Sequence, residues 1–277
     1  MKSPFTVYLD SNVLIQLCDG ANEALRAVIA SSVVDEKLIY PFSAEQIDEL
    51  TSSGRYEQSI SRLEYLSEIS KNKYFCNSVT ELGFGEQTPQ EVHETINKVT
   101  LLPDLQNALN SLITYEQRLQ VRSVLDLSPN ILNNMTGKEV VAAIDANLSK
   151  LAPADQSVPR SLKELLTFLE RYTPPEPRAF GEPSRSKTQY ERRNQNIVAL
   201  FSLLDTFGYW PDNKRAVKRG SGFADARHVV NASFYHVLVS ADRKLRGKAE
   251  AVYQILGLHT HVLSVEEFVR LEVINDD

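Results

Sequence analysis

In the first part of this sequence, short β-prone runs alternate with segments of helical periodicity, and this alternation constrains the fold more than any other feature. The run from Phe5 to Leu9 predicts a strand, and the apolar residues after it, up to Gly20, have helical spacing. A second helix is predicted from Glu23 to Ile29 and a second strand from Lys37 to Tyr40. The capping-box spacing of Ser43 to Gln46 begins a third helix. This order predicts a parallel sheet with helices on its faces.

The middle of the chain has a different pattern, because its apolar residues follow helical periodicity and no alternating strand is evident. Four further capping-box sequences precede these patterns; they begin at Thr88, Thr136, Ser161 and Thr188. Strands return near the end, at Val237 to Val239 and His261 to Leu263, each followed by a helix. We therefore predict a three-layer α/β/α fold, in which residues 1–75 and 209–277 form the core with a central parallel sheet and residues 76–208 form a large helical insertion.

The composition excludes several classes of protein. Hydrophobic content of 42% and charged content of 24% are those of a globular chain. No run approaches the roughly 20 apolar residues that cross a bilayer, so we expect no membrane partner. Two cysteines are too few for a disulfide framework or a zinc site, which is typical of the reducing cytoplasm. The net charge of −6 excludes a general nucleic-acid coat protein, but not an enzyme with a locally basic groove.

Acidic residues stand beside the predicted strands. Asp10 ends the first strand and Asp242 follows the strand at Val237. Glu49 lies on the helix after the second strand, and Asp225 begins a helix after two glycines. Because parallel strands place their carboxyl ends at one edge of a sheet, we expect these four acids to converge. Two carboxylates 4 Å apart repel by about 4 kcal/mol at an effective dielectric near 20. A cation between them relieves this repulsion, and an all-oxygen ligand set favours Mg²⁺ or Mn²⁺.

Each of these acids also has a structural interpretation. Asp is a favoured N-cap residue, so Asp10, Asp225 and Asp242 would also fit the start of a helix without any metal. Glu45 lies one helical turn before Glu49 on the same face and stays an alternative to it.

Four segments of the sequence, taken in order, resemble the motifs of PIN-domain nucleases. Residues 7–15 are similar to the opening strand with its Asp-x-Asn motif, and residues 43–50 to the second motif, whose acid precedes a leucine. Residues 225–232 are similar to the Asp-Ala-x-His helix of the family. Residues 238–245 resemble the last acidic motif, in which a small hydroxyl residue precedes the aspartate. The resemblance covers residues 1–75 and 220–277.

The resemblance implies a metal-dependent endonuclease that hydrolyses phosphodiester bonds, usually in RNA. Asp10, Asp225 and Asp242 would hold one or two Mg²⁺ or Mn²⁺ ions, and Glu49 would contact a metal directly or through water. Asn12 and Ser240 would orient the carboxylates by hydrogen bonds. His228 would either shape the site or pack beneath it.

Basic residues flank the predicted acids and are candidates for contacts with the phosphates of RNA. They are Lys214, Arg215, Lys218, Arg219, Arg243 and Lys244. A charge run is also typical of a solvated face, and this interpretation stays open. A regulatory protein or a second copy of the chain stays open as a further partner.

Three other functions are alternatives to this one. A phosphatase of the haloacid-dehalogenase class needs an acid two residues after its nucleophilic aspartate, but Asn12 stands there. A PIN-like scaffold that binds nucleic acid or a partner without cleavage is a second alternative. Cleavage of structured DNA is the third.

Overall fold

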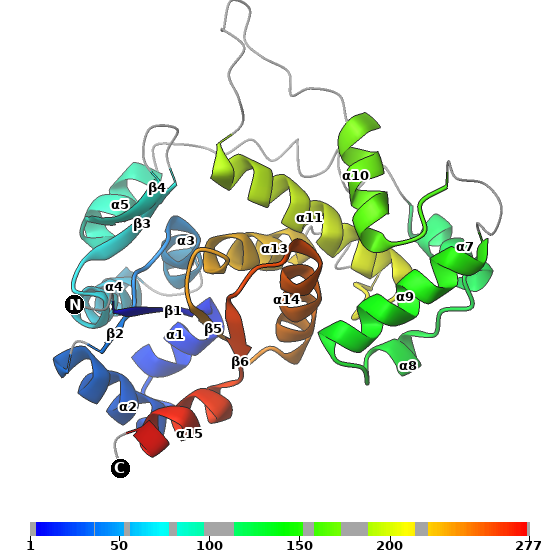
Figure 1. The fold of residues 1–277 in the computed structure, drawn as a ribbon. Helices are drawn as coiled ribbons and strands as arrows, with labels where there is room; N and C mark the ends of the chain where they lie inside the picture. Colours follow the sequence, from blue (N-terminus) through cyan, green and yellow to red (C-terminus); the bar gives the residue numbers. More distant parts are fainter. Residues whose placement is uncertain are drawn as a thin grey trace, which may run out of the picture. The chain divides into compact units, whose positions relative to one another are not determined.

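The described residues of the computed structural model are 4–35, 37–52, 56–77, 82–96, 114–151, 158–172, 188–213 and 221–275. They form an α/β protein with a central parallel sheet of four strands and many helices (Figure 1). The chain divides into two compact units. The sheet unit comprises residues 1–103, 227–246 and 259–277, and the helical unit comprises residues 104–226 and 247–258. No helix in the described part of the chain is long and apolar enough to cross a membrane.

The central sheet has the strand order β2-β1-β5-β6. Strand β1 (Phe5–Leu9) pairs in parallel with β2 (Leu38–Ile39) on one side and with β5 (Val237–Val239) on the other. Strand β5 in turn pairs in parallel with β6 (His261–Leu263). The structure confirms the four predicted strands and their parallel arrangement, although β2 is shorter than expected. All four carboxyl ends therefore lie at one edge of the sheet.

The helices that belong wholly to the sheet unit follow the predicted order. They are α1 (Ser11–Cys18), α2 (Glu23–Val34), α3 (Ala44–Ser52), α4 (Tyr56–Ser70), α5 (Pro89–Ile96) and α15 (Val265–Asn275). Helices α13 (Ser221–Ala232) and α14 (Arg243–Leu256) each have one end in each unit. The sequence signals did not predict α4.

The alternation of side chains along β1 separates the core from the site. Val7 and Leu9 point to one face, where they join an apolar cluster with residues of α1, α2, α4 and α15, among them Leu17. Tyr8 points to the other face, where its hydroxyl lies 2.7 Å from Nδ1 of His228 on α13. Helical residues thus cover both faces of the parallel sheet, and this arrangement is compatible with three α/β/α layers.

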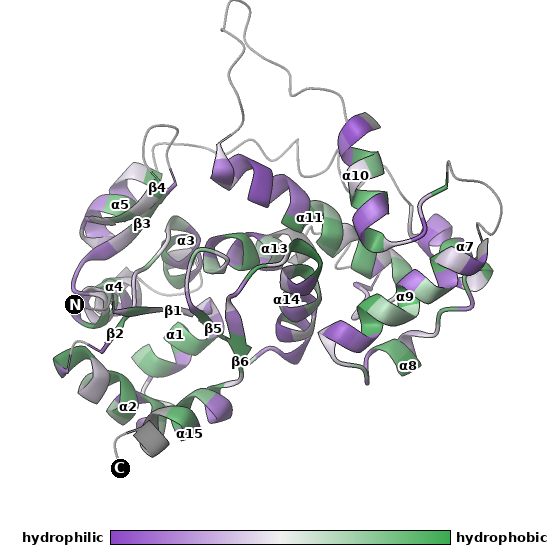
Figure 2. Ribbon diagram, in the orientation of Figure 1, coloured by the Kyte–Doolittle hydropathy of each residue, from purple (hydrophilic) through white to green (hydrophobic). Residues whose placement is uncertain are grey.

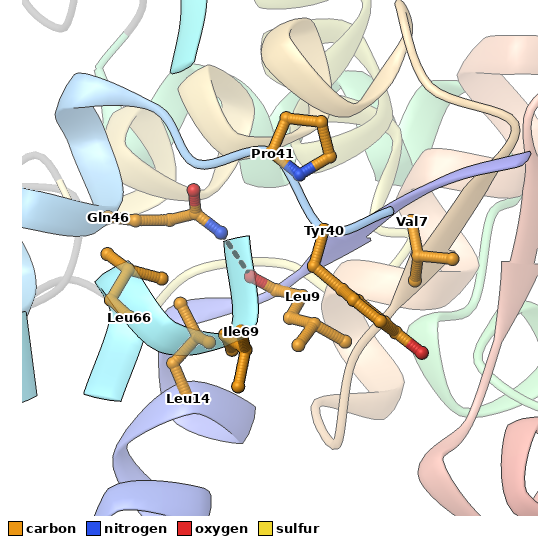
Figure 3. Close-up of a pocket in the computed structure, with 8 residues that line it drawn as sticks. All are labelled: Val7, Leu9, Leu14, Tyr40, Pro41, Gln46, Leu66 and Ile69. Atoms are coloured by element: carbon orange, nitrogen blue, oxygen red, sulfur yellow. Dashed lines mark hydrogen bonds between the residues drawn. The ribbon is translucent and has the colours of Figure 1, made fainter. Parts of the chain in front are cut away.

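Helix α3 is tied to the end of β1 by a side chain of its first turn. Nε2 of Gln46 donates to the carbonyl oxygen of Leu9 at 2.5 Å, beside Leu66 and Ile69 of α4 (Figure 3). Oε1 of Gln46 also accepts from the backbone N–H of Ser43 at 2.7 Å, which is the return bond of the predicted capping box. These bonds fix α3, and with it Glu45 and Glu49, against the sheet.

A two-stranded antiparallel sheet extends across the predicted boundary between the core and the helical insertion. Strand β3 (Lys73–Asn77) pairs with β4 (Leu82–Glu86), and Phe75 lies opposite Phe84. The expectation that no strand occurs in residues 76–208 was therefore wrong for β4. Its alternation was hidden because two of its five residues, Gly83 and Gly85, have low β-propensity.

The helical unit contains α7 (Tyr115–Val124), α8 (Pro129–Leu132), α9 (Gly137–Leu151), α10 (Leu162–Tyr172) and α11 (Gln189–Phe207). Reciprocal bonds form the predicted capping boxes at Thr136 and Thr188. Thr88 makes the same pair of bonds ahead of α5. Ser161 accepts from the Glu164 backbone, the forward bond of its box. Helix α11 is hydrophilic in its first half and hydrophobic toward its C-terminal end (Figure 2).

Candidate functional site

Asp10 and Ser240 are brought together at the carboxyl edge of the sheet by the pairing of β1 with β5. Leu9 pairs with Val239, so Asp10 and Ser240, the residues that follow them, lie side by side where the two strands end. The backbone N–H of Asp10 donates to the Val239 carbonyl at 2.9 Å. The Ser240 hydroxyl, which is fully buried, donates to Oδ2 of Asp10 at 2.8 Å. The predicted role of Ser240, to orient this carboxylate by a hydrogen bond, agrees with this contact.

Ser240 also links Asp10 to Asp242. Its Oγ accepts from the backbone N–H of Asp242 at 3.0 Å, so one buried hydroxyl holds both acidic segments. Oδ1 of Asp242 accepts from the backbone N–H of Lys244 at 2.7 Å, as an N-cap of α14 does. The guanidinium of Arg246 donates to the Ser240 carbonyl at 2.6 Å and places a positive charge beside this turn.

The carboxylate of Asp10 is used differently from that of Asp242. Asp10 occupies the N-cap position of α1, but its side chain makes no capping hydrogen bond there. It is 2% exposed, and this burial raises its pKa above the usual value of 3.8. The charge of His228 and the bond from Ser240 lower the pKa, while the negative charge of Glu49 raises it. Asp10 and Glu49 therefore act on one another through their charges.

Glu49 reaches this site from α3 and forms an ion pair with a buried histidine. Its Oε1 lies 3.0 Å from Nε2 of His228, and its side chain is 39% exposed. Burial raises the pKa of Glu49, but the hydrogen bond and charge of His228 outweigh burial, so the pKa falls below its usual value. Burial alone would lower the pKa of His228, but Glu49 and then Asp10 and Glu45 raise it above 6.5. His228 and Glu49 therefore each favour the charged form of the other.

Glu45, the alternative to Glu49, has a different set of partners. Arg227 binds Oε1 through Nη2 at 2.6 Å and Nε at 3.2 Å, and the Asn231 amide donates to Oε2. Both oxygens of Glu45 are therefore engaged by side chains of α13. This geometry favours Glu49 over Glu45 as the acid that acts beside Asp10.

The remaining predicted site residues are placed as follows. Asn12 is exposed in the first turn of α1, and Arg243 is exposed at the start of α14, directly after Asp242. Lys244 is half-buried. Asp225 lies three residues before His228 in α13, on the part of the helix that belongs to the helical unit, and its role as a ligand stays a prediction. Lys214, Arg215, Lys218 and Arg219 lie outside the described residues.

The side chains at this edge of the sheet that could contact a cation are oxygen donors. Asp10, Glu49 and Asp242 supply carboxylates, the kind of ligand that hard cations prefer. The buried Ser11 hydroxyl makes no hydrogen bond of normal geometry, but it lies close enough to Glu49 to lower the pKa of that carboxyl. Among the residues that the structure describes, no three histidine, cysteine, aspartate or glutamate side chains lie together as a group that could hold a metal ion, so the predicted convergence of the four acids is not seen there. The chain matches no protein-family model, no curated protein and no solved structure at a significant level.

Three residues that contribute to this site were not found from the sequence: Tyr8, Arg227 and Asn231. Tyr8 is separated from His228 by 220 residues, so no local pattern connects them. The other two carried a usable signal. Glu45 and Glu49 are four residues apart on α3, and Arg227 and Asn231 are four apart on α13. Two helix faces with this spacing and complementary polar groups are able to pack side by side.

Proposed function

We propose that this protein is a divalent-metal-dependent endonuclease with a PIN-like fold that hydrolyses phosphodiester bonds in RNA. The observation that carries the proposal is the environment of Asp10. Its carboxylate is buried at the carboxyl edge of the sheet, is held by Ser240, and makes no capping bond to α1. Burial and the charge of Glu49 disfavour the ionised form of Asp10, and the charge of His228 and the bond from Ser240 offset only part of this, since the pKa of Asp10 stays raised; a bound cation would offset the rest.

Asp10, Glu49 and Asp242, which all belong to the sheet unit, would hold the ion. Mg²⁺ or Mn²⁺ fits these donors because all of them are oxygen atoms. When bound, such an ion lowers the pKa of a coordinated water and offsets negative charge on a phosphate. Ser240 keeps Asp10 oriented, and Arg243 offers an exposed positive charge next to Asp242 for the nucleic-acid backbone.

A non-cleaving scaffold is favoured by a different observation. Oδ1 of Asp242 caps α14 and Glu49 is paired with His228, so two of the acids already have partners within the protein. A PIN-like domain that binds RNA or another protein without cleaving it would need only these structural roles for the two acids, and no metal ion. The two functions differ in their dependence on Asp10 and on metal.

The test is incubation of the purified protein with total RNA, transfer RNA, single-stranded DNA and a structured DNA, in Mn²⁺ or in EDTA, followed by mapping of the ends. We expect cleavage of RNA in Mn²⁺ only, and its loss in Asp10→Asn and Asp242→Asn. Asp48→Asn is the matched control, because Asp48 is an exposed acid on α3 next to Glu49. Cleavage by Asp10→Asn at the wild-type rate would refute the site. Metal-independent RNA binding without cleavage would establish the scaffold, and cleavage of structured DNA alone would change the substrate.

A further inference from the structure

A chain of four polar side chains connects the centre of β1 to the acid on α3. The Ser43 hydroxyl lies 3.2 Å from the Tyr8 hydroxyl, which lies 2.7 Å from Nδ1 of His228. Nε2 of His228 then lies 3.0 Å from Oε1 of Glu49. Ser43 directly precedes α3 and Glu49 lies in the second turn of α3. The series of hydrogen-bonded side chains therefore begins next to α3, passes through β1 and α13, and ends on α3.

The first three members of this chain are buried and only the last reaches solvent. Tyr8, Ser43 and His228 are at most 3% exposed, while the Glu49 side chain is 39% exposed. Both ring nitrogens of His228 are engaged, one by Tyr8 and one by Glu49, so the ring cannot turn without losing a bond. A buried imidazole held at both nitrogens is a rigid support for the carboxylate that it contacts.

We propose that His228 is a positioning residue, held by Tyr8, that fixes the Glu49 carboxylate beside Asp10 so that the two acids meet a divalent cation as a preformed pair. This inference rests on the proposed function and deepens it. Groups that hydrogen-bond to metal-binding carboxylates commonly set their orientation, and their loss weakens metal binding.

The competing interpretation is that His228 only fills space beneath the site. A matched pair of tyrosines in the protein distinguishes this interpretation from a positioning role for His228. Tyr8 and Tyr235 are both buried and their rings pack edge to face at 5.1 Å. The Tyr235 hydroxyl donates to the Pro41 carbonyl at 3.2 Å. Loss of the Tyr8 hydroxyl releases His228 and Ser43, whereas loss of the Tyr235 hydroxyl removes the buried hydrogen bond to Pro41.

The experiment measures Mn²⁺ binding to the full chain by the loss of the electron paramagnetic resonance signal of free Mn²⁺, with melting temperature recorded for every variant. We expect His228→Leu to weaken Mn²⁺ binding by about 10- to 100-fold. His228→Gln, which keeps an N–H donor near the position of Nε2, should recover part of that loss. Tyr8→Phe should weaken binding and Tyr235→Phe should not, even where both variants lose similar stability.

Asp10→Asn separates failure of this inference from failure of the proposed function. If wild type binds Mn²⁺, Asp10→Asn abolishes binding, and both His228→Leu and Tyr8→Phe bind as wild type does, then His228 is only a packing residue. If wild type binds no Mn²⁺, the proposed metal site fails and the inference fails with it. If His228→Leu does not fold, Tyr8→Phe against Tyr235→Phe decides, because each keeps its aromatic ring.

Discussion

Removal of the Ser240 hydroxyl should reveal how strongly the carboxyl edge of the sheet depends on one buried group. Ser240→Ala deletes a bond to the Asp10 carboxylate and a bond from the Asp242 N–H. A hydrogen bond to a charged group contributes about 1.5–3 kcal/mol and one between neutral groups about 0.5–1.5 kcal/mol. We therefore expect the free energy of unfolding in EDTA at pH 8 to fall by about 2–4 kcal/mol.

The assay is urea unfolding followed by far-ultraviolet circular dichroism. The only tryptophan, Trp210, lies in the helical unit, so its fluorescence monitors that unit separately from the sheet unit that holds Ser240. Ser233→Ala is the matched control, because Ser233 is also buried but its hydroxyl donates to a carbonyl within its own helical turn. The control should cost about 1 kcal/mol.

A double-mutant cycle with Asp10→Asn tests the cause of this loss. In the Asn background the bond from Ser240 is made to a neutral amide, so Ser240→Ala should cost about 1 kcal/mol less than in wild type. If Ser240→Ala costs no more than Ser233→Ala, or if its cost is the same in both backgrounds, Ser240 does not hold an ionised Asp10.

Two further predictions concern the ion pairs of the two units. The folded-state pKa of Glu49 lies below 4.5, so the stability that its ionised form contributes is present above pH 4.5 and is lost as the pH falls through the folded-state value. The folded-state pKa of His228 lies above 6.5, so the stability that its protonated form contributes is present below pH 6.5 and is lost as the pH rises through the folded-state value. Melting curves in EDTA should therefore show the largest cost of Glu49→Gln between pH 4.5 and 6.5, and a cost that does not change with pH would contradict the pairing. In the helical unit, Arg118→Met leaves the buried carboxylate of Asp205 with weaker partners, among them Lys248 at 3.7 Å, and should cost about 3–5 kcal/mol. Denaturation followed by Trp210 fluorescence measures this cost, and a loss below about 1 kcal/mol would mean that the pair is not essential.

The sheet and part of the site were predictable because their signals are local. Each strand of the central sheet is a short β-prone run next to a helix, and parallel pairing then places Asp10 and Ser240 at one edge without further information. The helix caps at Thr136 and Thr188 were predictable for the same reason, since each bond joins residues three apart. The β4 strand was missed because glycines interrupt its alternation.

The environment of each acid was not predictable, because it depends on side chains that are distant in the sequence. Asp242 and Asp10 both precede helices and looked alike, yet only Asp242 uses its carboxylate as a cap. Glu45 and Glu49 share one helix face, and the choice between them depends on Arg227 and His228 on another helix. These distinctions follow from the side-chain contacts between α13 and α3, which no pattern within either segment specifies.

The measurement that tests the central claim most directly is anomalous X-ray diffraction from crystals of the protein grown or soaked in Mn²⁺. We predict an anomalous peak in direct contact with the carboxylates of Asp10 and Asp242, with Glu49 in contact directly or through water. The same peak should be absent in Asp10→Asn. A protein that cleaves RNA in Mn²⁺ but binds the ion away from these three carboxylates would contradict the account.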